Sequence, residues 1–144
     1  MPQMTKNQID EFLSGKHLMK LATLSPDGYP YVNPVWFIYD GQTFTIGGRD
    51  KSEWVANIKS DARVSFCIDT CELPYARVII KGTAVIEDPA WISDGSFALK
   101  YLGDSEGKKY STGTKDNPRA LVRITPEHWT TWVGIDWHPR YEAD

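Results

Sequence analysis

The sequence predicts a mainly β protein, a small antiparallel barrel with short helices around it. Three apolar segments, 17–25, 29–39 and 42–46, follow one another with only short turn sequences between them. Connections this short join antiparallel strands, because parallel strands need a crossover of about a dozen residues or more. No βαβ repeat is present, which excludes a Rossmann or TIM-barrel architecture. The 144 residues fit one domain, 1–144.

The second of these segments is apolar on both of its faces. Val32, Trp36 and Ile38 alternate along it with Val35 and Phe37. A strand buried on both sides indicates a barrel wall that also meets another subunit or a flat ligand. The proline at position 34 marks an edge or a bulge, where backbone groups are free to bind that ligand.

The remaining elements follow from caps, turns and alternation. A capping box at Thr5 and Gln8 begins a helix that ends near Gly15. Three further segments, 63–69, 77–87 and 119–126, complete six strands, and Gly82 is placed where a barrel strand bends. We expect a helix from residue 88 to Gly103, a surface loop over 104–118, and a tail that packs on the barrel or on a partner through its tryptophans, Trp129, Trp132 and Trp137.

One stretch, residues 44–58, has the order of parts that a phosphate site needs. A strand ends in Gly47 and Gly48, the cations Arg49 and Lys51 follow, and a helix over 50–59 begins with Asp50 as its predicted N-cap. Glycines allow close approach of the backbone, cations supply charge, and the N–H groups of a starting helix face an anion. We interpret the stretch as the phosphate end of a flavin-type cofactor site. The alternative is a solvated, charged loop.

Charge and composition narrow the class of protein. The net charge is −3, with acidic and basic residues interspersed, so no electrostatic footprint for nucleic acid is present. No apolar run approaches the length of a membrane span, and the N-terminus lacks a signal-peptide pattern, which predicts a cytoplasmic protein. Cys67 and Cys71 are too few for a disulfide framework and have no histidine at zinc-ligand spacing.

Several motifs in order resemble one family. The run ATLSPDGYPYVNPVWF at 22–37, then Arg49-x-Lys51, Asn57, the run ARV at 62–64 and the run VIIKGTA at 78–84 resemble the pyridoxamine 5′-phosphate oxidase-like split-barrel flavoproteins. The resemblance implies a six-stranded antiparallel split barrel and a homodimer with two cofactor sites at the interface, each built from both subunits. It implies FMN as cofactor, or the deazaflavin coenzyme F-420, which relatives hold in the same groove.

Candidate cofactor-binding residues follow from the two ends of that groove. Backbone groups of the second strand should lie along the ring edge, and the glycine–cation–helix stretch should hold the phosphate. For Trp54 the alternative to cofactor binding is packing in the core, and for Lys81 it is a position at the mouth of the barrel. Asn57 is better explained as a contact between the helix and the barrel than as a ligand of the cofactor. The candidates are Val32, Asn33, Pro34, Val35, Trp36, Ile46, Gly47, Gly48, Arg49, Lys51, Trp54 and Lys81.

The expected activity is that of an FMN-dependent oxidoreductase acting on a small molecule. No catalytic residue is assigned, because the sequence shows no triad, metal cluster or carboxylate dyad, and flavin chemistry needs none. A deazaflavin-dependent reductase is the first alternative. A non-catalytic flavin- or haem-binding protein and a barrel that works only through protein contacts are the others. The substrate and the electron donor stay open.

Overall fold

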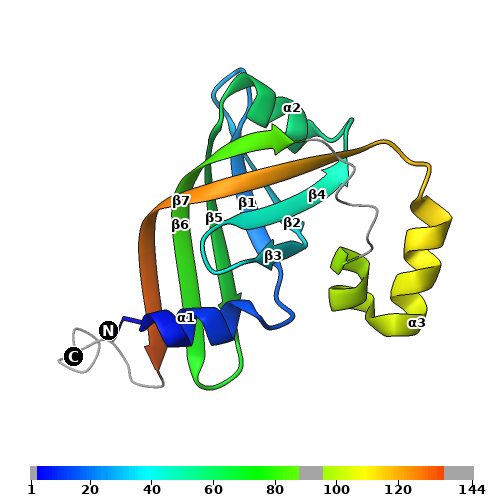
Figure 1. Ribbon diagram of the computed structural model, residues 1–144. Coiled ribbons are helices and arrows are strands. Elements are labelled where there is room, and N and C mark those ends of the chain that lie inside the picture. The colour runs from blue at the N-terminus through cyan, green and yellow to red at the C-terminus, as the bar shows by residue number, and fades with distance from the viewer. Residues whose placement is uncertain (1–2, 88–95, 135–144) are drawn as a thin grey trace.

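The computed structural model describes residues 3–87 and 96–134 (Figure 1). No helix within these ranges is long and apolar enough to cross a membrane. The described elements, in chain order, are α1 (Lys6–Leu13), β1 (Met19–Leu24), β2 (Pro30–Val35), β3 (Phe37–Tyr39), β4 (Phe44–Arg49), α2 (Glu53–Ser60), β5 (Arg63–Thr70), β6 (Tyr75–Glu87), α3 (Ser96–Thr114) and β7 (Arg119–Gly134).

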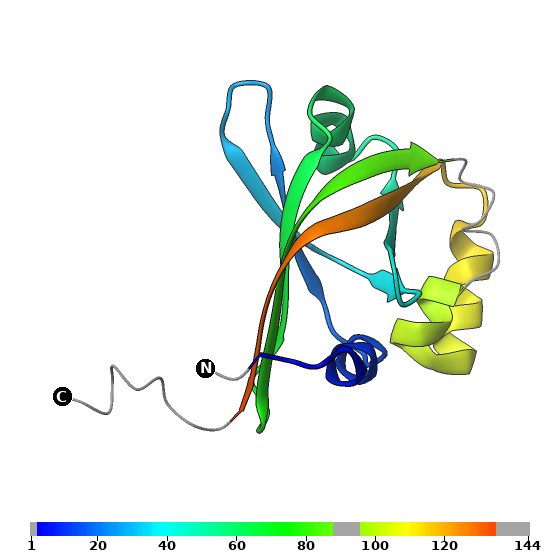
Figure 2. The same cartoon turned by 60° about the vertical axis from the view of Figure 1, so that its left-hand side comes forward.

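All seven described strands form one antiparallel sheet in the order β2-β1-β5-β6-β7-β4-β3. The sheet curls into a half-barrel, as the two views show (Figures 1 and 2). Its two terminal strands, β2 and β3, are consecutive in the chain and meet at Trp36. The mainly β split barrel is therefore confirmed. The predicted strand 29–39 divides at Trp36, which gives seven strands instead of six.

The core fills the inside of the curl because each strand turns alternate side chains inward. In β5, Val64, Phe66 and Ile68 are buried and their neighbours are not, as predicted. Helices close the two ends, with α1 across one end and α2 across the other (Figure 1). The capping box is confirmed, since the Gln8 N–H donates to Thr5 Oγ1 at 3.2 Å and the Thr5 N–H donates to Gln8 Oε1 at 2.8 Å.

β7 is longer than predicted. It pairs with β6 from Leu121 to Gly134, and the register shifts at Lys81/Gly82, so the strand passes Pro126 and continues to Gly134. A Cβ at position 82 would lie 2.5 Å from the Thr125 carbonyl oxygen, so only glycine fits at this bulge, as its predicted bend requires. The expected tail is therefore strand as far as Gly134.

The tryptophans of this extension face opposite sides of the sheet. Trp129 lies against the rings of Tyr39 and Phe44 on the inner side, whereas Trp132 stacks with Tyr75 on the outer side. Trp137 lies outside the described residues.

The prediction of a loop over 104–118 is wrong for most of that segment. Gly103 has a φ of 80° and ends the first helical segment, as expected, but a second segment follows at once and reaches Thr114. The two segments pack closely, because a Cβ at Gly107 would lie 2.8 Å from the Ala98 carbonyl oxygen. The polar composition of this stretch reflects the solvent-facing side of a helix. The predicted helix start at residue 88 lies outside the described residues.

Candidate functional site

The edge of β2 offers free backbone groups. β2 ends the sheet and pairs only with β1, where Pro34 lies opposite Lys20 and Pro30 opposite Leu24. A proline has no N–H to donate, so these are the positions whose backbone groups point away from β1. Val32 lies between the two prolines with the same orientation. Its N–H and the carbonyls of Pro30, Val32 and Pro34 therefore face the open edge.

The side chains of β2 are divided between solvent and interior. Val32 is 63% exposed, and Val35 is buried in the core. The Asn33 side chain lies on the opposite face of the sheet from Val32. Its Oδ1 atom is buried with no hydrogen-bond partner among the described residues. A buried acceptor without a donor costs about 1–3 kcal/mol. The position therefore has room for a donor from a water, a ligand or a second chain.

The barrel splits where β2 leaves β4. β3 pairs with β4, with Phe37 opposite Ile46, so the chain enters this part of the wall at Trp36. β2 still touches β4, but no ladder joins the two strands. β4 ends at Arg49. The open edge of β2 and the cations at the end of β4, Arg49 and Lys51, consequently border the same split.

Helix α3 fastens the junction between β2 and β3. The Tyr101 hydroxyl accepts from the Phe37 N–H at 3.1 Å and donates to the His17 carbonyl at 2.6 Å. The Tyr101 ring stacks on Trp36 with centroids 5.1 Å apart and planes 4° apart. Lys100 Nζ donates to the Phe37 carbonyl at 2.8 Å. These contacts hold the Trp36 side chain, one of the predicted site residues, against α3.

Lys100 occupies an unusual environment for a lysine. Its ammonium lies over the rings of Phe37 and Tyr101, 4.0 Å and 5.1 Å from their centroids, with no carboxylate paired to it among the described residues. Burial lowers the pKa of Lys100 to about 8 and raises the pKa of Tyr101 to about 12. At neutral pH both groups are protonated, so both serve as donors. Neither role is among the predictions from the sequence, where the available signal is a lysine next to a tyrosine in a predicted helix.

The cations Arg49 and Lys51 are exposed, and neither has an ion pair or a side-chain hydrogen bond within the described residues. They belong to a turn that the Ser52 N–H closes on the Arg49 carbonyl at 3.0 Å. The prediction of Asp50 as N-cap is wrong, because this turn delays the helix and Ser52 becomes the N-cap of α2. The Ser52 side chain makes no capping bond, so the first N–H groups of α2 have no side-chain acceptor.

Three neighbouring candidates serve the core instead of facing a ligand. The Ile46 side chain is fully buried. A Cβ at Gly48 would lie 2.5 Å from Trp54 Cζ2, so Gly48 gives room to the indole, and Trp54 belongs to the core cluster. The core alternative for Trp54 is thus the one that the packing supports. Gly47 has the opposite alternation in β4 and faces the outer side of the sheet.

Asn57 and Lys81 lie apart from the other candidates. Asn57 is 2% exposed and its Nδ2 donates to Thr23 Oγ1 at 3.1 Å, which confirms the helix-to-barrel contact. Lys81 is exposed on the outer face of β6. β1 and β5 separate β6 from β2, a distance of about 14 Å for three strand spacings. A single chain therefore does not bring Lys81 to the edge of Val32.

A curled antiparallel sheet that is open along one edge is the fold of small split-barrel proteins. In this chain, cations that are unpaired within the described residues lie beside the opening. The chain matches the family model described as pyridoxamine 5′-phosphate oxidase over residues 5–133. It belongs to this family, as the sequence motifs indicate.

Solved structures share the same fold. A conserved hypothetical protein from Mycobacterium tuberculosis has a TM-score of 0.76 and 27% identity, over 90% of this chain and 85% of that one. An F420 reductase has a TM-score of 0.64 and 24% identity, over 84% and 94% of the two chains. The haem storage protein HutZ from Vibrio cholerae has a TM-score of 0.68 and 17% identity, over 89% and 93%. The search of curated proteins found no significant match.

Proposed function

We propose that this protein is a homodimeric oxidoreductase that binds FMN at the split between β2 and β4 and acts on a small molecule. One observation carries the proposal. The free backbone edge of β2 and the unpaired cations at the end of β4 border the same split. A flat ring with a phosphate tail needs these two features side by side.

The ring end fits a flavin through its backbone pattern. Prolines on both sides leave one free donor, the Val32 N–H, between the carbonyls of Pro30 and Pro34 on the open edge. The pyrimidine edge of a flavin carries two carbonyl oxygens with an N–H between them, so the Val32 N–H can donate to one ring carbonyl while an adjacent backbone carbonyl accepts from the ring N–H. The same prolines oppose pairing with another strand, because two of the three outward-facing positions of β2 lack an N–H donor. The edge is therefore better suited to a ring than to a peptide.

The phosphate end fits through charge. Arg49 and Lys51 carry two positive charges that no described acid neutralises, and the N-terminus of α2 follows them directly. Charge-assisted bonds to phosphate are about twice as strong as neutral ones. When bound, the flavin supplies the hydride or electron step. The residues of this chain bind it, orient it and exclude water.

The outer face of the sheet supports the homodimer. Its exposed and half-buried apolar side chains include Val32, Ala22, Ile79 and Trp132, and the Trp132 indole N–H is buried without an acceptor among the described residues. A second copy on this face covers the apolar area and supplies polar partners. Sedimentation of the purified protein tests this directly, and a monomer at micromolar concentration would contradict the dimer.

Two of the structures with this fold, the F420 reductase and the haem storage protein HutZ, suggest the alternative ligands, coenzyme F-420 and haem. The decisive experiment is mass spectrometry of the cofactor that co-purifies, followed by titration of the apoprotein with FMN, coenzyme F-420 and haem. A yellow protein that releases FMN is expected. If the protein binds coenzyme F-420 more tightly than FMN, the deazaflavin is its cofactor. If it binds only haem, the proposal that it is an oxidoreductase is refuted.

The double variant Arg49→Ala/Lys51→Ala tests the phosphate end. We expect it to weaken FMN affinity by on the order of 10- to 1,000-fold, because each charged contact contributes about 1.5–3 kcal/mol and solvent screens part of it. Lys16→Ala/Lys59→Ala is the matched control, since both lysines are exposed and unpaired within the described residues. Equal FMN affinity in both double variants would refute the phosphate assignment.

A further inference from the structure

Two arginines face each other across β4 and β7. Arg49 lies directly opposite Arg119 in the register. Their neighbours Gly48 and Ala120 are also opposite each other and face inward, where Gly48 meets the core residue Trp54. Both arginine side chains consequently stand on the outer face of the sheet. Cross-strand partners of this kind have Cβ atoms about 4.5–5.5 Å apart.

The Arg119 side chain is held in place from α3. Its Nη2 donates to the Thr114 hydroxyl, and its guanidinium carbon lies 5.4 Å from the centroid of the Tyr110 ring. The Thr114 hydroxyl itself donates to the Tyr110 carbonyl at 2.8 Å, so it is oriented to accept from the arginine. The Asp50 N–H donates to the Pro118 carbonyl at 3.3 Å and ties the ends of the two strands together. The guanidinium is thus positioned beside Arg49 by neutral groups only.

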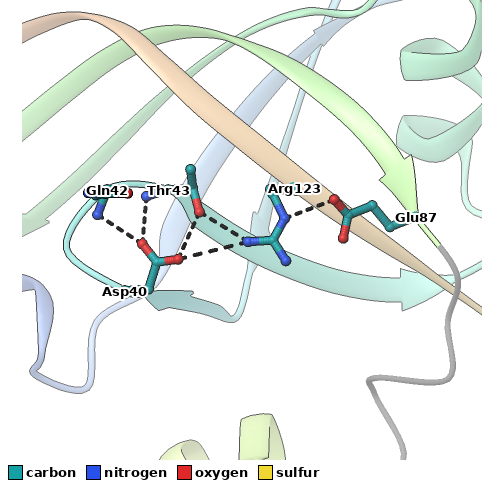
Figure 3. A network of polar contacts seen from close by, with 5 residues as sticks. All are labelled: Asp40, Gln42, Thr43, Glu87 and Arg123. Atoms are coloured by element: carbon teal, nitrogen blue, oxygen red, sulfur yellow. Dashed lines mark hydrogen bonds and ion pairs between the residues drawn. The ribbon is translucent and has the colours of Figure 1, made fainter.

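This pair of like charges contrasts with the next arginine on the same face. Arg123, four residues further along β7, donates through Nε to Glu87 at 2.8 Å and lies 3.8 Å from Asp40 (Figure 3). Arg49 and Arg119 have no carboxylate partner within the described residues. Like charges directly opposite each other in a sheet are destabilising. An anion between them removes that repulsion, and Lys51 in the following turn adds a third positive charge.

We propose that Arg119 is a phosphate-binding residue that completes the anion site of Arg49 and Lys51, and that the site takes a phosphate monoester. The inference rests on the proposed function and extends it to a residue on a different strand. A monoester carries about 1.5–2 negative charges at pH 7. Three cations more than balance that charge, and the planar fork of an arginine suits two phosphate oxygens at once.

The test compares FMN with riboflavin, which has the same ring and lacks the phosphate. Dissociation constants of both are measured by fluorescence for the wild type, Arg119→Gln, Arg119→Lys and the control Arg77→Gln. Arg77 is exposed and unpaired within the described residues. It lies near the start of β6, far from the end of β6 that pairs with β7 beside Arg119. Urea unfolding of each variant verifies that it folds. We expect Arg119→Gln to weaken FMN binding by about 10- to 100-fold, consistent with one charge-assisted contact.

Riboflavin binding should change less than threefold in Arg119→Gln. Arg119→Lys, which retains the charge and loses the fork, should give an intermediate FMN affinity. An FMN affinity of Arg119→Gln equal to that of Arg77→Gln overturns the role of Arg119 and leaves the proposed function standing. If the wild type binds neither flavin, the proposed function fails, and titration with inorganic phosphate decides the anion site. Phosphate binding that is lost in Arg119→Gln supports the site, and no phosphate binding by the wild type overturns it.

Discussion

Removal of one hydroxyl group, by Tyr101→Phe, tests how α3 fastens the junction of β2 and β3. In the wild type this oxygen accepts from the Phe37 N–H at 3.1 Å and donates to the His17 carbonyl at 2.6 Å. Phenylalanine retains the ring and therefore the stack on Trp36. The substitution isolates the two hydrogen bonds from the aromatic contact.

The magnitude follows from burial. A typical hydrogen bond contributes about 0.5–1.5 kcal/mol net, and a buried donor left without a partner costs about 1–3 kcal/mol. Phe37 is fully buried, so water does not readily replace the lost acceptor of its N–H. The His17 carbonyl lies nearer the surface and loses less. We expect Tyr101→Phe to lower the free energy of unfolding by about 2–3 kcal/mol.

Urea unfolding followed by tryptophan fluorescence measures this change, because Trp36 lies against the substituted ring. The matched control is Tyr110→Phe. The Tyr110 side chain is exposed and its hydroxyl forms no hydrogen bond within the described residues, so its loss should change stability by less than about 0.5 kcal/mol. If the two variants are equally stable, α3 does not hold the junction through Tyr101.

Two further predictions concern packing and pH. Gly48→Ala should lower the free energy of unfolding by about 1–3 kcal/mol, because the added Cβ would lie 2.5 Å from Trp54. Gly113→Ala adds a Cβ with nothing within 4 Å and should stabilise α3 by up to about 1 kcal/mol. Urea unfolding that ranks the two variants the other way contradicts the packing. Burial lowers the pKa of Lys100 from 10.5 to about 8, so between these values the unfolded chain binds more protons and stability rises with pH. The unfolding free energy of the wild type minus that of Lys100→Met should therefore increase from pH 8 to pH 10, and a constant difference contradicts the shift. The raised pKa of Tyr101 acts in the opposite direction above pH 10, which the same subtraction removes.

The fold was predictable because its signals are local. Alternation in 63–69, the capping box at Thr5 and the bend at Gly82 each depend on neighbours in sequence, and the structure confirms all three. The division of 29–39 at Trp36 was not readable. It depends on how far the curl of the sheet carries β2 away from β4, and although Pro34 indicates an edge, nothing in the segment locates the division at Trp36.

The errors near the site have the same physical origin. Asp50 and Glu53 have the spacing of a cap and its partner, but the turn closed by Ser52 on Arg49 moves the start of α2. The capping pattern depends only on residue spacing, so it does not predict the turn that precedes the helix. The role of Lys100 cannot be predicted from its neighbours, because it depends on the carbonyl of Phe37, 63 residues away in the chain, to which Lys100 donates.

Helix α3 connects the two ends of the proposed cofactor site. At the ring end its Tyr101 stacks on Trp36, and at the phosphate end its Thr114 accepts from Arg119. Tyr110 touches both ends, since its ring lies 5.5 Å from the Trp36 ring and 5.4 Å from the Arg119 guanidinium carbon. On the proposed function, the distance between the ring and phosphate subsites is set partly by a helix that belongs to neither strand. Because the two helical segments meet at Gly103 and pack through Gly107, one hairpin of helices holds both Trp36 and Arg119, the residues at the two ends of the proposed site.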